Sequence, residues 1–195
     1  MHLALLVVDV QRDFCPRGAL AVKEGDEVVP GLNRLIAEFE KSKLPIFFTR
    51  DWHPPNHTSF KEQGGIWPRH CVQGTAGAEF HPDLQIPPSA VVISKGDNPK
   101  AEAYSGFQGT DLAGLLKKAG VDEVVLGGLT TDYCVRESAM DALRAGFKVQ
   151  VLEDCIRAVN ANPGDGPKAI ADVRKAGAKM TTSSVVLSQL AGTQQ

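Results

Sequence analysis

The chain alternates between short apolar runs and segments whose apolar residues recur at helical spacing. The run from Leu3 to Val8 stops at Asp9, as a strand buried on both faces does. Similar runs predict strands at residues 45–49, 91–94, 123–126, 148–152 and 179–182. Helical spacing predicts helices around residues 32–39, 112–119, 132–145 and 166–176, and a last short helix after the sixth strand. This alternation predicts the α/β class, with three α/β/α layers around a six-stranded, mostly parallel sheet.

One long segment interrupts this alternation. Residues 51–88 contain six prolines and no clear periodicity, and they are rich in His, Trp and Phe. Loops of this length in compact domains are usually functional or disordered, and the composition here favours function. We therefore expect a single domain over residues 1–195, in which the insertion 51–88 contributes to a metal and substrate site.

Composition and charge exclude several classes of function. With 21 Lys and Arg against 23 Asp and Glu, the formal net charge is −2, which argues against a nucleic-acid partner. The longest apolar run is far shorter than the ~20 residues that a membrane span needs, and it makes a poor signal peptide. The four scattered cysteines form no CxxC pair and indicate free thiols in a reducing compartment. We expect a cytoplasmic protein without a membrane partner; whether it forms a homo-oligomer stays open.

Reactive side chains follow four of the predicted strands. In a parallel sheet the carboxyl ends of the strands meet at one edge, where ligands bind. That edge collects Asp9 after the first strand, Asp51 and His53 after the second, Lys95 after the third, and Cys134 shortly after the fourth. The topology alone therefore predicts one site from these residues.

Cys134 is the candidate nucleophile of this site. It lies in the first turn of a predicted helix, where the helix dipole and the ammonium of Lys95 would stabilise a thiolate. Asp9 would accept the thiol proton and return it to a leaving group, and backbone N–H groups around Thr130 and Cys134 would hold an oxyanion. Taken alone, Cys134 is better explained as a small core residue, and Asp9 with Lys95 as well explained as a buried ion pair. Their shared edge favours catalysis.

A carboxylate and imidazoles form a second candidate group. In an extended segment Asp51 and His53 point the same way, so both can bind one ion. The third ligand would be His70 or His57, and such a set suits zinc, iron or manganese. The alternative is that these are exposed loop histidines. Three of the five histidines lie within eighteen positions beside an aspartate, which favours a metal site.

Aromatic residues are interspersed among these groups. Phe14, Trp67, Tyr104 and Tyr133 are candidates for a flat pocket that binds a ring by stacking, although any one of them could instead fill the core. Phe60 and Phe107 have more the character of core residues.

Five segments together resemble the nicotinamidase (pyrazinamidase) branch of the isochorismatase-like hydrolases. They are DVQRDF at 9–14, TRDWHP at 49–54, WPRHCVQGT at 67–75, SKG at 94–96 and TTDYCV at 130–135. The segments keep their order and extend over most of the chain. The resemblance implies an amidohydrolase that converts nicotinamide to nicotinate and ammonia through a thioester, that also accepts pyrazinamide, and that serves NAD salvage.

The resemblance also implies roles for individual residues. Cys134 attacks the carboxamide carbon, Asp9 shuttles the proton and Lys95 supports the charged pair. A cis peptide bond between Leu129 and Thr130 aims the N–H groups of Thr130 and Cys134 at the oxyanion. The implied metal ligands, for one divalent ion with zinc as first choice, are Asp51, His53 and His70. The resemblance implies that Phe14 and Trp67 sandwich the substrate ring, and we expect Leu20, Tyr104 and Tyr133 to contact the substrate as well.

Two departures and two alternatives remain at this stage. His57 does not clearly reproduce the spacing of the fourth ligand of some members, so it stays a candidate behind the ligands or beside the substrate. Arg12 stands where many members have Asn. The same catalytic group could serve another small amide, such as a carbamoyl or ureido compound. A non-catalytic binding module, with Cys134 buried and inert, is the alternative from another class.

Overall fold

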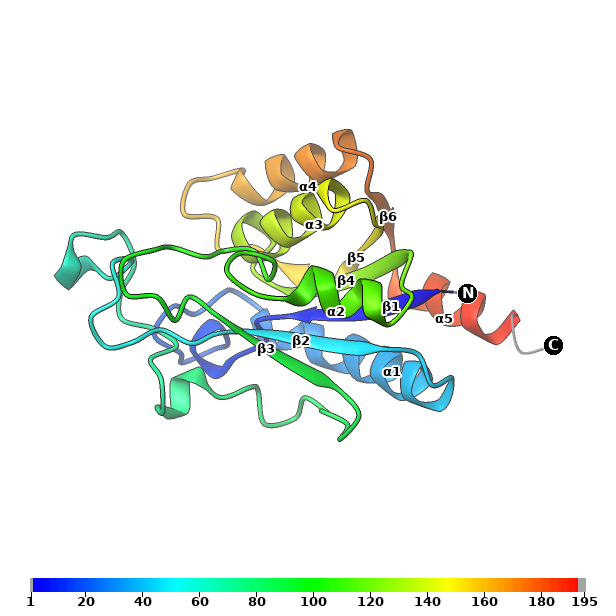
Figure 1. Ribbon diagram of the computed structural model, residues 1–195. Coiled ribbons are helices and arrows are strands. Elements are labelled where there is room, and N and C mark those ends of the chain that lie inside the picture. The colour runs from blue at the N-terminus through cyan, green and yellow to red at the C-terminus, as the bar shows by residue number, and fades with distance from the viewer. Residues whose placement is uncertain (1, 193–195) are drawn as a thin grey trace.

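The computed structural model describes residues 2–192, so the first residue and the polar tail at 193–195 lie outside the described residues. Six strands form one sheet in the order β3-β2-β1-β4-β5-β6, and all neighbouring strands are parallel (Figure 1). The strands are β1 (Leu3–Val8), β2 (Ile46–Asp51), β3 (Val91–Lys95), β4 (Glu123–Leu129), β5 (Lys148–Arg157) and β6 (Lys179–Thr181). The helices are α1 (Val28–Lys41), α2 (Leu112–Lys118), α3 (Arg136–Arg144), α4 (Asp165–Lys175) and α5 (Ser183–Gly192).

Two apolar cores lie on opposite faces of the sheet. Because side chains of a strand alternate between faces, Leu5 and Val7 of β1 belong to one core, and Leu6 and Val8 belong to the other. Helices α1 and α5 cover the first face, and α2, α3 and α4 cover the second (Figure 1). This confirms the predicted class of fold, with three α/β/α layers and a six-stranded sheet.

The fourth and fifth strands run further toward the site than their apolar pattern predicts. The expected ends were residues 126 and 152, whereas β4 ends at Leu129 and β5 at Arg157. The added part of β4 includes Gly127 and Gly128, which pair with Val7 and Val8 of β1. A side chain at residue 128 would overlap the backbone of Val8, so this close pairing requires glycine there. A hydrophobicity pattern does not detect a strand that continues through glycine. The predicted helix 132–145 likewise divides into a π-helical turn, Thr131–Val135, and α3.

The strand order has its reversal point between β1 and β4, and ligands of such sheets bind beyond the carboxyl ends of strands there. Asp9 follows β1, and Cys134 lies in the turn after β4. Asp51 and Lys95 end the next two strands, β2 and β3. The fold therefore sets the four residues around one point.

The segment between β2 and β3 is folded, although it holds neither an α-helix nor a sheet strand among its described residues. Two 3-10 turns, Lys61–Gln63 and Ala76–Ala78, and two bridges, His53 to Val72 and Phe60 to Trp67, give it its shape. Phe60 and Trp67 are buried in it. No helix within residues 2–192 has both the length and the apolar character needed to cross a membrane.

Candidate active site

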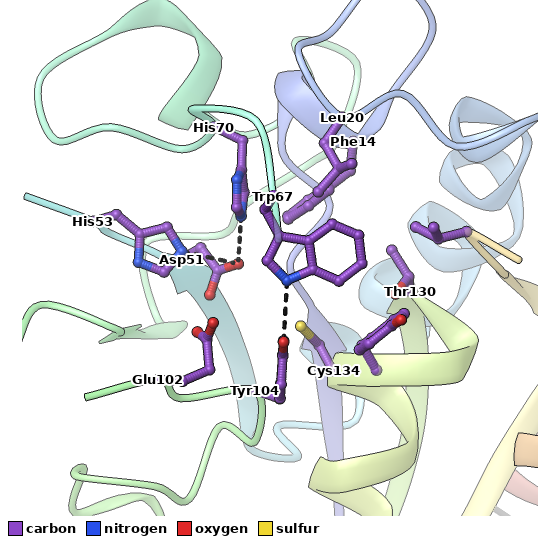
Figure 2. A pocket seen from close by; sticks show the side chains of 12 residues that line it. Phe14, Leu20, Asp51, His53, Trp67, His70, Glu102, Tyr104, Thr130 and Cys134 are labelled. Atoms are coloured by element: carbon purple, nitrogen blue, oxygen red, sulfur yellow. Dashed lines mark hydrogen bonds and ion pairs between the residues drawn. The ribbon is translucent and has the colours of Figure 1, made fainter. Parts of the chain in front are cut away.

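A pocket opens at the reversal point of the sheet and encloses about 330 Å³, including space open to solvent. Figure 2 shows Asp51, His53 and His70 gathered on one side of it and Cys134 with Thr130 on the other. The residues that line it are Phe14, Leu20, Asp51, His53, Trp67, His70, Glu102, Tyr104, Thr130, Tyr133, Cys134 and Val159. Asp9 and Lys95 lie beneath it, fully buried.

Lys95 is the centre of the charged group below the pocket. Its ammonium forms ion pairs with Asp9, at 2.9 Å, and with Asp51. It also donates to the carbonyl of Ala103 at 3.2 Å and lies 3.5 Å from the sulfur of Cys134. Burial lowers the pKa of Lys95, but Asp51 and Asp9 outweigh it and hold that pKa well above its ordinary value. The amine is therefore a permanent positive charge.

Asp9 is held beside this charge by a turn in the backbone. Its φ of 48° is left-handed, and its N–H donates to the carbonyl of Thr49 at 3.1 Å. The hydroxyl of Thr49 donates to Asp9 Oδ1 at 2.6 Å, which leaves Oδ2 toward Lys95. Burial raises the pKa of Asp9, and Lys95 lowers it only in part. A carboxylate with a raised pKa is a stronger proton acceptor than one in water.

The surroundings of Cys134 shift the pKa of its thiol in opposite directions. Its side chain is buried, and burial raises the pKa of Cys134 well above its ordinary value, while Lys95 lowers that pKa only in part. The carboxylates of Asp9 and Asp51 raise it further. Lys95 therefore favours the thiolate, as expected, while burial and the two carboxylates favour the thiol, and Asp9 is the adjacent group that can accept its proton.

The buried charges allow a prediction about stability. We expect Lys95→Met to lower the free energy of unfolding by about 3–5 kcal/mol, because it leaves two buried carboxylates without their counter-charge. Lys41→Met is the matched control, since its ion pair with Glu38 is on the surface and is worth about 1 kcal/mol or less. Urea unfolding measures both. Equal losses in the two variants would contradict the buried charge group.

Three donors on the other side of the pocket fit a divalent metal ion. Nε2 of His53 and Nε2 of His70 lie 3.6 and 4.0 Å from the same oxygen, Oδ2 of Asp51. These separations are too long for hydrogen bonds and are close to the spacing of about 3.3 Å between ligands around a tetrahedral zinc ion. Nδ1 of His53 contacts the carbonyl of Gly96 at 2.9 Å, and Nδ1 of His70 contacts that of Pro68 at 2.8 Å. Such contacts keep Nε2 available as the ligand atom.

His57 lies behind these donors and does not line the pocket. Its Nδ1 is 2.7 Å from the hydroxyl of Ser59, and its Nε2 is 3.1 Å from the carbonyl of Ala101. Its ring packs on that of His53, with centroids 4.2 Å apart. Phe60, expected as a core residue, packs against both rings. His57 is therefore placed to support His53, and it also belongs with His53 and Glu102 to a second group whose possible ligand atoms all lie within 4.8 Å of one another.

The aromatic residues form the remaining wall. The indole N–H of Trp67 donates to the hydroxyl of Tyr104 at 3.0 Å (Figure 2). Tyr133 packs edge-on against Trp67, with centroids 4.9 Å apart. The ring of Phe14 packs against that of His70, with centroids 5.7 Å apart, so the aromatic wall continues to the metal donors. Aromatic surfaces of this kind bind flat rings by stacking.

The structure adds residues that sequence reasoning missed. Val159 and Glu102 line the pocket, but each belongs to an irregular loop without periodicity, so no pattern signals them. Asp51 has two contacts, because Oδ1 pairs with Lys95 while Oδ2 faces the histidines. The sequence assigned Asp51 to the metal alone. One carboxylate therefore joins the candidate metal site to the charged group at Cys134.

The fold and the site define the class of protein. The family model for the isochorismatase domain matches residues 3–185, and the chain belongs to the isochorismatase family. Among curated relatives, the nicotinamidase of Escherichia coli (strain K12) is 42% identical over 92% of this chain and 94% of its own. The crystal structure of Pyrococcus horikoshii pyrazinamidase in complex with zinc is 49% identical, with a TM-score of 0.89 over 93% of this chain and 99% of that one. PnC1 from L. infantum in complex with nicotinate is 38% identical, with a TM-score of 0.87 over 93% of both chains.

Proposed function

We propose that this chain is a metal-dependent cysteine amidohydrolase that converts nicotinamide to nicotinate and ammonia. The observation that carries the proposal is a single aromatic pocket with a divalent-metal donor set on one side and the Asp9–Lys95–Cys134 group on the other. The relatives named nicotinamidase and pyrazinamidase support this substrate class. Pyrazinamide, whose ring also carries nitrogen, is expected to be a second substrate.

The chemistry begins with proton transfer from a neutral thiol. Asp9 takes the proton of Cys134 as the sulfur attacks the carboxamide carbon, so no free thiolate accumulates in the buried site. Asp9 then gives that proton to the departing amino group, which leaves as ammonia, and a thioester remains. Asp9 next takes a proton from water, whose oxygen attacks the thioester. The C–S bond breaks, Asp9 returns its proton to the sulfur, and the second proton of the water passes to solvent as the product leaves as nicotinate.

Charge that develops on the carboxamide oxygen needs donors at the same end of the pocket. Thr130 and Cys134 both line it, beside the cis peptide bond between Leu129 and Thr130. Their backbone N–H groups are our candidates for the oxyanion site, where preorganised donors contribute strongly to catalysis. Lys95, within 3.5 Å of the sulfur, stabilises negative charge on sulfur and on Asp9 in turn.

The rest of the pocket binds the ring. Phe14, Leu20, Trp67, Tyr104 and Tyr133 supply its walls. When bound by Asp51, His53 and His70, a divalent ion would take up the pyridine nitrogen and orient the carboxamide toward Cys134. We propose zinc, with iron or manganese as the alternatives that metal analysis of the purified protein would distinguish.

Ammonia release tests the proposal directly. The purified, metal-loaded protein is incubated with nicotinamide, with pyrazinamide and with a ureido compound that has no ring. We expect release from the two ring carboxamides and little from the third. Release from the ureido compound alone would instead indicate the related small-amide hydrolase. Release from none of them would support a non-catalytic module.

Metal removal separates binding from chemistry. We expect a chelator-treated sample to show a KM for nicotinamide raised by at least about tenfold, because one lost strong polar contact costs about 1.5–3 kcal/mol. The chemical step depends on Cys134 and Asp9, so kcat should change less. Steady-state kinetics before and after zinc is restored measure this. An unchanged KM with a lost kcat would contradict the assigned role of the ion.

A further inference from the structure

The side chain of Gln11 is fully buried, and Gln11 is not among the residues that line the pocket. Its Nε2 donates to the carbonyl of Asp51 at 2.8 Å and to that of Ala78 at 2.9 Å. Its Oε1 accepts from the N–H of Asp51 at 2.8 Å. One side-chain amide thus satisfies both backbone groups of Asp51.

The local backbone explains why a side chain is needed there. Strand β1 pairs with β2 only as far as Val8 and Thr49, because the left-handed turn at Asp9 takes the chain away from the sheet. On its other side Asp51 pairs with Lys95 of β3. Without Gln11, the N–H and carbonyl of Asp51 that face β1 would be buried without these partners, which is unfavourable for both groups. The Gln11 amide takes the place of the missing strand.

A displacement of Asp51 would change both the candidate metal site and the charged group around Lys95. Its Oδ1 pairs with Lys95, and its Oδ2 lies between His53 and His70. The geometry points to Gln11 as a positioning residue that fixes Asp51 for both tasks, ion binding and placement of the Lys95 ammonium. This inference rests on the proposed function for its catalytic part and on the donor set alone for its metal part.

Two variants of Gln11 test this role. Gln11→Leu keeps the bulk and removes three hydrogen bonds. Gln11→Glu keeps the size and the acceptor for the N–H of Asp51, but it loses both donors. Gln150→Leu is the matched control, because Gln150 is a buried glutamine in β5 whose Oε1 has no partner within the described residues. Zinc affinity is measured by competition with a chromophoric chelator, and folding by thermal unfolding.

We expect both Gln11 variants to bind zinc about 10- to 100-fold more weakly, as is usual when the groups that hold a ligand are removed. At saturating zinc, kcat for nicotinamide should also fall, whereas Gln150→Leu should keep the zinc affinity and kcat of the wild type even where its melting temperature is lower. Should Gln11→Leu not fold, Gln11→Glu decides the question.

Wild-type zinc affinity in a folded Gln11 variant would overturn the positioning role, and so would an equal loss of affinity in Gln150→Leu. The zinc titration needs no turnover. A wild-type protein that binds zinc but does not hydrolyse nicotinamide would therefore contradict the proposed function and leave the metal part of this inference to be decided by the titration.

Discussion

Replacing Cys134 by alanine is expected to lower kcat for nicotinamide by at least about 10⁴-fold, because the carboxamide then has no nucleophile to form the thioester. The aromatic wall of the pocket and the metal donors are unchanged in this variant, so nicotinamide should still bind. Ammonia release measures turnover, and isothermal titration measures binding.

Cys155→Ala is the control for this variant. Cys155 is also a buried cysteine, and burial raises its pKa to about 12, but it does not line the pocket. It should keep wild-type turnover. Substantial hydrolysis by Cys134→Ala, or equal losses in both variants, would mean that the sulfur of Cys134 is not the nucleophile.

The second large effect is expected for Asp9→Asn. Asparagine keeps an oxygen for the hydrogen bond from Thr49, but it does not accept the thiol proton. We expect kcat/KM to fall by about 10²- to 10⁴-fold, the usual contribution of a general base. Asp83→Asn makes the same chemical change at an exposed position and should have no effect.

The role of Asp9 as a base also predicts how activity changes with pH. Asp9 must be ionised to act as the base, and burial raises its pKa above the ordinary value. Activity of the wild type should therefore be present at neutral pH and fall as the pH is lowered through that raised pKa. Asp9→Asn should lose this acidic limb. A wild-type limb that persists unchanged in Asp9→Asn would show that another group titrates.

The sequence was enough to predict which residues meet at the edge of the sheet, because chain order and strand direction determine which strand ends lie there. Asp9, Asp51 and Lys95 each stand at or directly after the end of a strand, and parallel strands place such positions together. Cys134 follows β4 across one turn, so it also reaches this edge. Periodicity is enough for this inference and needs no knowledge of side-chain packing.

Packing determines what the sequence did not reveal. The depth at which Cys134 is buried makes desolvation outweigh the ammonium of Lys95, and no spacing rule reports burial of that degree. Val159 reaches the pocket from the loop after β5, and the apolar pattern missed that β5 extends to Arg157. Gln11 lay in a recognised motif, but its bonds to Asp51 depend on where β1 turns away.

Trapping the intermediate tests the central claim most directly. The protein is mixed with nicotinamide, quenched in acid within a turnover and digested, and its peptides are examined by mass spectrometry. The account predicts one nicotinoyl group on the sulfur of the peptide that contains Cys134, and none in Asp9→Asn quenched at the same time. Rapid product formation without that adduct, or an adduct on another residue, would contradict it.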